Sequence, residues 1–171
     1  MRAYVNYFRL RVITALQYRA AAISGFFTQL FFGFIYLMVY LAFYESNSSS
    51  SLPMNFQNLV NYLWISQAFF ALTYPYEKDQ SLMKMIKNGN LAYELIRPQN
   101  FYLKFYIKMI AKKLVNAGLR CGPLIIVAAL LPDPLKLTFP STKVILVFII
   151  SLLLSCLLVS ALSMFIHIVM M

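Results

Sequence analysis

The residues that could carry chemistry are few, and their spacing favours no catalytic site. His167 is the only histidine, so a metal cluster of several histidines cannot be assembled, and we expect no Ser-His-Asp triad. It lies in an apolar run, where a packing hydrogen bond is the more common role and a proton relay the rarer one. The sequence contains no G-x-x-x-x-G-K-[ST] motif. We therefore expect no enzyme activity, no metal and no cofactor, and any ATP hydrolysis must come from another polypeptide.

Three polar residues inside apolar runs are candidates for a pathway through a membrane: Asn61, Gln67 and Arg120. The two amides are expected to face another helix or a cavity, because polar groups in hydrocarbon need partners. Arg120 follows Lys113 by about 10 Å along a helix, which lets its side chain extend back to the cytosolic interface. The alternative is a cation that faces a central cavity and pairs with an anionic group of a substrate.

Residues 79–88 (DQSLMKMIKN) are the most informative segment of the chain. Helical spacing puts apolar residues on one side and polar residues on the other: Leu82, Met83, Met85 and Ile86 against Lys84, Lys87 and Asn88. Gly89 then stands where a helix C-cap belongs. Such a short helix has two interpretations, because its apolar face can pack against the chain's own membrane helices or fit a groove in a partner protein.

A basic and aromatic helix is predicted after Pro98, since proline suits the first turn of a helix. Lysines recur every four residues among aromatic side chains: Lys104, Lys108 and Lys112 with Phe101, Tyr102, Phe105 and Tyr106. Such a stripe suits the head-group layer of a membrane, which attracts both lysine and aromatic residues.

The composition indicates a membrane protein. Of the 171 residues, 61% are hydrophobic and 12% are charged, an apolar share well above that of a soluble domain and a charged share about half as large. In a soluble protein the net charge of +10 would indicate that the protein binds nucleic acid. In a membrane protein the same excess marks cytosolic segments, so we expect anionic lipid and no nucleic acid as a partner.

We predict an all-α polytopic membrane protein with a single transmembrane domain over residues 1–171. Its elements are an interfacial helix at 1–19, four spans at 20–44, 59–76, 114–131 and 144–171, and a helical cytosolic loop at 77–113. Lysine and arginine number four before the first span, none in the next loop, eight in the cytosolic loop and two in the last loop. This distribution places the N-terminus and the 77–113 loop in the cytosol.

Three segments resemble the membrane subunit of a type-2 ATP-binding-cassette (ABC) transporter, in the bacterial permease group that includes viologen-exporter-like proteins. They are YFRLRVITALQYRAA (7–21), GFFTQLFFGFIYLMVYLAFY (25–44) and MIKNGNLAYELIRPQN (85–100). The resemblance runs over essentially the whole chain. It implies a permease of the bacterial inner or plasma membrane that pairs with a second permease subunit and with ABC ATPase subunits to export a hydrophobic or cationic compound.

The same resemblance implies that residues 78–89 dock into the ATPase. The docking residues are Asp79, Leu82, Met83, Lys84, Met85, Ile86, Lys87 and Gly89. A loop signature follows them at Glu94, Leu95, Arg97 and Pro98. Members of this family have six spans, so four spans and an uncapped apolar end at Met171 lead us to expect a chain truncated at its C-terminus.

Other classes of membrane protein fit the residues less well. The main alternative is a membrane-embedded scaffold or assembly factor without transport activity. Small channels and secondary transporters usually carry acids or paired helix breaks inside their spans, and here only the 114–131 span has such breaks. A membrane enzyme is disfavoured for lack of a catalytic constellation.

Overall fold

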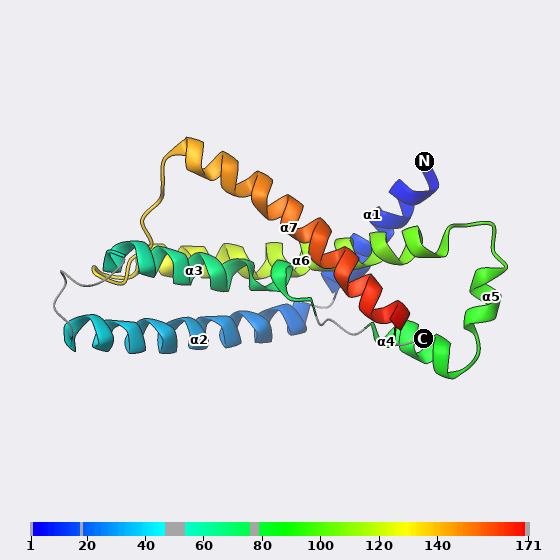
Figure 1. Cartoon of the computed structure of the whole chain (residues 1–171), viewed down its shortest axis with the longest axis horizontal. Helices are drawn as coiled ribbons and strands as arrows, with labels where there is room; N and C mark the ends of the chain where they lie inside the picture. Colours follow the sequence, from blue (N-terminus) through cyan, green and yellow to red (C-terminus); the bar gives the residue numbers. More distant parts are fainter. Residues whose placement is uncertain (1, 18, 47–53, 76–78, 170–171) are drawn as a thin grey trace. The chain divides into compact units, whose positions relative to one another are not determined.

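The computed structural model describes residues 2–17, 19–46, 54–75 and 79–169, and every regular element in these ranges is an α-helix (Figure 1). The helices are α1 (Arg2–Gln17), α2 (Arg19–Ser46), α3 (Phe56–Thr73), α4 (Gln80–Lys87), α5 (Leu91–Leu95), α6 (Phe101–Leu130) and α7 (Thr142–Val169). The predicted all-α class is confirmed. Lys78, which begins the expected docking segment, lies outside the described residues.

Among the described residues, three helices are long and apolar enough to cross a membrane: Ala20–Ser46, Phe101–Leu130 and Thr142–Val169. Each contains an 18-residue window of high mean hydropathy, at 1.9, 1.5 and 3.0 respectively. The predicted second span corresponds to α3, whose 18 residues would suffice in length. Four amide side chains lower its hydropathy: Gln57, Asn58, Asn61 and Gln67. The structure thus supports a membrane location through three apolar helices, and α3 is less apolar than the windows of these three.

Large apolar side chains of α2 and α7 lie mainly on the outside of the protein. Phe31 is 64% exposed, Val147 68% and Leu154 62%. Apolar surface on this scale is unfavourable in water and favourable in hydrocarbon. These helices therefore have the surface that a lipid environment requires.

The third span begins earlier than the sequence predicted. We expected it to start at residue 114 and to be preceded by a separate helix in the cytosolic loop. Instead α6 runs without interruption from Phe101 for 30 residues, so the basic stripe and the apolar run share one helix. The lysines of the predicted basic helix favour helix, and no glycine or proline separates them from the apolar part, so the two predicted elements join into one.

The chain divides into two compact units. The first unit comprises residues 1–17, 72–115 and 149–171, and the second comprises 18–71 and 116–148. The core of the second unit lies among α2, α3, α6 and the loop after α6. Its buried residues are Leu37, Val60, Leu63, Trp64, Ala68, Leu124, Ala128 and Leu137.

Trp64 is the largest side chain in the core of the second unit, and it is 1% exposed. Its indole N–H donates to the carbonyl oxygen of Leu135 at 3.0 Å, and its ring meets that of Phe34 edge to face at 5.5 Å. A methyl group added at Gly33 would lie 3.0 Å from the indole ring. Glycine at this position therefore lets the tryptophan of α3 pack against the backbone of α2.

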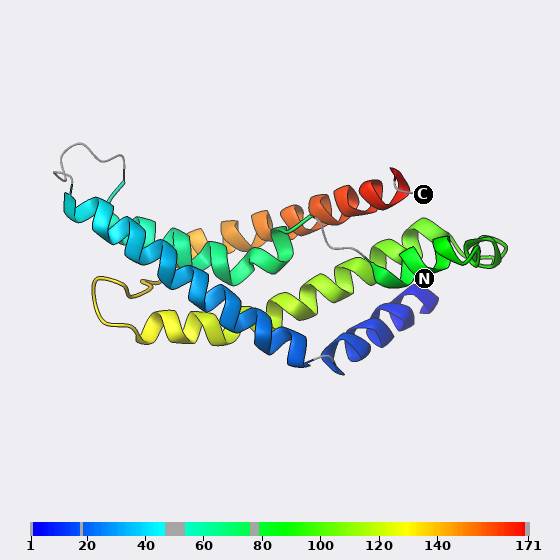
Figure 2. The same ribbon diagram turned by 90° about the horizontal axis from the view of Figure 1, so that it is seen from below.

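The core of the first unit is smaller and forms around α4. Its buried members, which we call the α4 cluster, are Leu82, Phe105, Met109 and Met164. They come from α4, α6 and α7. In the same unit α1 lies beside the first half of α6 (Figure 2), where the Tyr4 hydroxyl accepts a hydrogen bond from the Asn100 N–H at 3.4 Å.

Candidate functional site

The helix predicted from residues 79–88 is present as α4, with Asp79 at its start and the predicted Gly89 just after its end. Asp79 caps its start, because the carboxylate oxygen Oδ1 accepts from the backbone N–H groups of Ser81 (2.9 Å) and Leu82 (3.3 Å). Gly89 follows its end with φ of +69°, a left-handed conformation that favours glycine. The predicted bounds differ from those of α4 by one residue at each end.

The apolar face of α4 packs inside the first unit. Leu82 is 1% exposed in the α4 cluster, and Met85 and Ile86 are half-buried against it. Of the two interpretations that the sequence left open, the structure contains the packing against the chain's own helices. The groove-docking face that we expected on these three residues therefore needs correcting, because α6 and α7 already cover it. Of the other docking residues, Met83 is half-buried, and Lys84, Lys87 and Gly89 are exposed.

An ion pair joins the start of α4 to α6. The ammonium of Lys108 lies 2.5 Å from Oδ2 of Asp79 and also donates to the Ser81 hydroxyl. Both charged side chains are largely buried, at 15% and 14% exposure. Burial alone would raise the pKa of Asp79, but the hydrogen bonds from Lys108 and Ser81 outweigh it and hold the pKa at about 2. Asp79 is therefore ionised at neutral pH.

A second contact joins the start of α4 to α7 through His167, which is 2% exposed. Its Nε2 accepts from the backbone N–H of Asp79 at 3.0 Å, while Nδ1 lies 2.6 Å from the carbonyl oxygen of Ser163. Because Nε2 accepts, this network assigns the proton to Nδ1, and a neutral ring satisfies both bonds. His167 thus has the packing role, one of the two that the sequence allowed.

The residues of the α3–α4 connection directly after α3, Tyr74 and Pro75, are also hydrogen-bonded to side chains of α6 and α7. Lys113, which is 1% exposed, donates from Nζ to the carbonyl oxygen of Tyr74 at 2.6 Å. The Ser163 hydroxyl donates to the carbonyl oxygen of Pro75 at 2.7 Å. We call the bonds from Lys108, Lys113, Ser163 and His167 to this connection the clamp. It ties the backbone on both sides of residues 76–78 to α6 and α7.

The loop signature joins α5 to α6. Glu94 accepts a hydrogen bond from Lys104 at 2.6 Å and forms an ion pair with Arg97 at 3.2 Å. The hydrogen bond from Lys104 is the main reason that the pKa of Glu94 lies below its ordinary value, against a smaller opposing effect of burial. Leu95 and Pro98 are exposed, with 60% exposure for Leu95. Within the signature, Glu94 is therefore the residue that joins α5 to α6.

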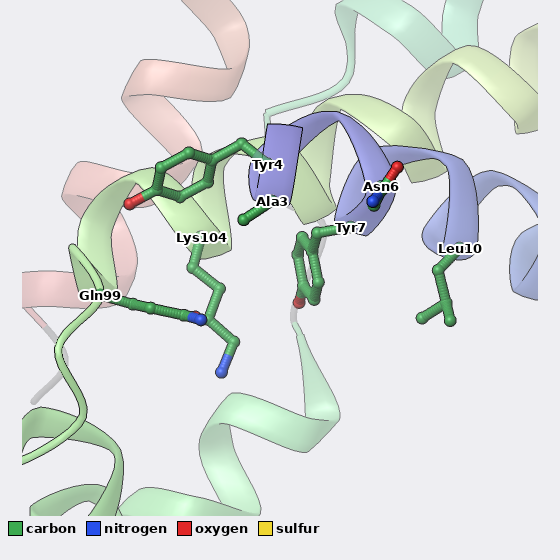
Figure 3. A pocket seen from close by; sticks show the side chains of 7 residues that line it. All are labelled: Ala3, Tyr4, Asn6, Tyr7, Leu10, Gln99 and Lys104. Atoms are coloured by element: carbon green, nitrogen blue, oxygen red, sulfur yellow. The ribbon is translucent and has the colours of Figure 1, made fainter. Parts of the chain in front are cut away.

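A cavity of about 300 Å³ lies between α1 and the start of α6 (Figure 3). Its lining residues are Ala3, Tyr4, Asn6, Tyr7, Leu10, Gln99 and Lys104. Lys104 is the only charged residue in this lining, and its ammonium is already paired with Glu94. The cavity therefore offers aromatic and amide groups but no free charge.

The three candidate pathway residues do not form one site. The amide of Asn61 bonds Thr138 twice, donating to the hydroxyl at 2.7 Å and accepting from the backbone N–H at 2.9 Å. Both of its polar atoms thus fix the loop after α6. Gln67 is half-buried and lies about 120° away around α3. Arg120 extends from α6 to the start of α2, where Nη2 donates to the Ala21 carbonyl oxygen at 3.4 Å.

Sequence reasoning missed two groups of polar residues. Lys113 and Ser163 of the clamp bond backbone atoms far away in the sequence, and no local pattern signals such bonds. Gln29 was passed over as part of an apolar run, yet it is 5% exposed and neither of its amide atoms has a hydrogen-bond partner. Its spacing of four residues from both Gly25 and Gly33 is the signal that could have placed it on the packed face of α2.

Comparisons with protein-family models, with curated proteins and with solved structures gave no match.

Proposed function

We propose that the chain is the permease subunit of an ATP-driven ABC export system in the bacterial cell membrane. In this proposal α3 is a fourth span, and the N-terminus and residues 77–113 are cytosolic. A second permease subunit completes the pathway, and anionic lipids contact the basic cytosolic face. Because the sequence has no nucleotide-binding motif, a separate ATPase subunit supplies the energy.

The clamp is the observation that carries the proposal. A coupling element has to be accessible to an ATPase on one side and joined to the membrane helices on the other. The polar edge of α4 is exposed at Lys84 and Lys87, while its first residues are bonded to α6 and α7. A displacement of α4 would therefore move both helices and shift their populations between two arrangements.

The surface available to an ATPase differs from the one that the sequence suggested. Three apolar residues in and after α5 point away from the first unit: Tyr93 is 72% exposed, Leu95 60% and Ile96 80%. Neighbouring apolar side chains this exposed mark interaction surfaces, and a few such anchors usually dominate binding. We propose that these three residues, with Lys84 and Lys87 of α4, contact the ATPase.

A bilayer is a poorer partner for this surface than a protein. The 30 residues of α6 extend about 45 Å, whereas the hydrocarbon core is about 30 Å thick. With Leu130 at the outer edge of the core, Lys104 lies about 10 Å beyond the inner edge. The bond from Lys104 holds Glu94, and with it α5, at this level. Hydrocarbon therefore does not reach the exposed residues of α5.

Site-directed photo-crosslinking in cells tests the proposal. A crosslinker at Ile96 should capture a protein with a nucleotide-binding motif, and one at the half-buried Met85 should not. Ile96→Glu should weaken association with this ATPase roughly 10-fold or more, because burying such an anchor is worth about 1.5–3 kcal/mol. Lys84→Ala should have a much smaller effect.

The outcomes separate the function from the docking surface. An ATPase that co-purifies but tolerates Ile96→Glu would refute the docking surface and leave the permease standing. If no ATPase crosslinks and membrane vesicles show no ATP-driven uptake, the scaffold alternative replaces the permease. Labelling a cysteine at Lys87 from outside intact cells would contradict the orientation.

A further inference from the structure

Arg120 lacks a counter-ion in the described part of the chain. The ion pairs there involve Asp79 and Glu94, both in the first unit, whereas Arg120 belongs to the second. Its guanidinium lies against α2 at Gly25, where an added methyl group would be 2.5 Å from Nε. Nε is buried and has no hydrogen-bond partner, and the Nη2 bond to Ala21 is long at 3.4 Å.

Gln29 lies on the same face of α2, one helical turn after Gly25. Gly25 faces Arg120 of α6, and Gly33 faces Trp64 of α3, so the stripe that contains Gln29 is turned toward the interior of the second unit. Gln29 is 5% exposed, and both its amide oxygen and its amide nitrogen are without a partner. The amide of Gln29 thus has a donor and an acceptor without hydrogen-bond partners, one helical turn from the position where the unpaired Arg120 contacts α2.

Buried polar groups in a membrane protein are paired, because hydrocarbon supplies no hydrogen bonds and an isolated charge costs more still. A guanidinium fits the two oxygens of a carboxylate or phosphate, and a neighbouring amide fits an ester, amide or hydroxyl group. We propose that Arg120 and Gln29 bind an amphipathic anion, whose acidic head group lies at Arg120 and whose less polar part lies toward Gln29.

Two simpler occupants fit less well. Water can satisfy the amide of Gln29, but it does not neutralise Arg120 in a low-dielectric region. A cationic compound, which the resemblance to viologen exporters would imply, would be repelled by Arg120. The apolar body of an amphiphile is compatible with the site, since Phe26 and Leu30, on either side of Gln29 in α2, pack against the apolar core.

The site can be tested on the isolated full chain in a neutral detergent. Binding is followed through Trp64, the single tryptophan, with dodecanoate as the anionic probe and dodecyltrimethylammonium as the cationic probe of equal chain length. The variants are Arg120→Gln, Gln29→Leu and the control Lys143→Gln. The control removes the same charge from an exposed position in the second unit.

We expect wild type and Lys143→Gln to bind dodecanoate alike and to show no saturable binding of the cation. Arg120→Gln should bind at least tenfold more weakly, because a charge-assisted bond is lost, and Gln29→Leu roughly fivefold more weakly. Equal binding of the two probes, or wild-type affinity in Arg120→Gln, would overturn the proposal. If Arg120→Gln does not fold, unchanged affinity in Gln29→Leu overturns it instead.

The anion could be a membrane lipid or a solute, and native mass spectrometry separates the two. Phosphatidylglycerol retained by wild type but not by Arg120→Gln identifies a lipid, with phosphatidylcholine as the neutral comparison. Dodecanoate binding without retained lipid identifies a solute. If the chain binds neither dodecanoate nor lipid, the proposed site is refuted. The interpretation of this site as a cargo site rests on the proposed export function. The binding test itself needs no ATPase, so a negative result would refute the site and leave the permease proposal intact.

Discussion

Removing the charge of Asp79 should loosen the start of α4 without unfolding the rest of the chain. The carboxylate caps α4 and pairs with Lys108 of α6 at 2.5 Å. Asp79→Asn keeps a side chain that caps helices well, but it loses the ion pair and leaves Lys108 without its counter-ion. Asp79→Ala loses the cap in addition. The two variants thus separate the contribution of the charge from that of the cap.

The size of the effect follows from the pKa of Asp79. The fold lowers this pKa from 3.8 to about 2. At 1.36 kcal/mol per pH unit, the ionised carboxylate stabilises the folded state by about 2 kcal/mol at neutral pH. Asp79→Asn should therefore raise the opening equilibrium of α4 roughly 30-fold, and Asp79→Ala on the order of 100-fold because a cap adds about 1 kcal/mol.

Hydrogen–deuterium exchange of the amides of residues 82–88 measures this opening directly. Glu94→Gln is a matched control, because it removes a paired carboxylate from α5 and should speed exchange there without affecting α4. Wild-type exchange rates for α4 in Asp79→Asn would refute the inference that the ion pair holds this helix.

The same linkage predicts how α4 responds to pH. Because the folded pKa of Asp79 is lower than the unfolded one, the stabilisation is complete above about pH 4 and declines as the pH falls toward 2. Protection of the α4 amides, corrected for intrinsic exchange rates, should fall in this window in wild type. It should stay flat in Asp79→Asn, and a similar decline in both proteins would assign the pH effect to another group.

Two further predictions concern the second unit. Gly33→Leu should displace Trp64 and destabilise the chain by about 1–3 kcal/mol, seen as a shift in tryptophan fluorescence, whereas Gly118→Leu should do neither because open space surrounds Gly118. Equal effects of the two substitutions would contradict the close packing at Gly33. Asn61→Leu should remove both hydrogen bonds to Thr138 and cost about 1–2 kcal/mol, detectable as faster exchange in residues 131–141. Unchanged exchange there would show that the amide does not hold this loop.

The parts of the fold that could be read from the sequence depend on local chemistry. Gly89 marked the end of α4 because capping uses atoms within a few residues of the helix end. The basic helix after Pro98 and the span from residue 114 were predicted as separate elements, whereas α6 joins them, since positive charge gives no information on whether a helix continues.

The site was less predictable, because its bonds join distant segments. The amphipathic pattern of α4 identified its apolar face correctly but gave no information on what covers it, and Leu82 proved to be buried by α6 and α7. The amide of Asn61 looked like a pathway group until Thr138 was found to use both of its polar atoms. Gln29 shows the opposite case, in which an amide in an apolar run remained unpaired.

The clamp also bears on which positions of the chain can change over evolution. The carbonyl oxygens of Tyr74 and Pro75 and the N–H of Asp79 are backbone atoms, so substitutions at positions 74 and 75 leave these acceptors in place. The groups that bind them belong to side chains, those of Lys113, Ser163 and His167, and have no such freedom. A deep mutational scan should therefore find tolerance at positions 74 and 75 and intolerance at Lys113, Ser163 and His167.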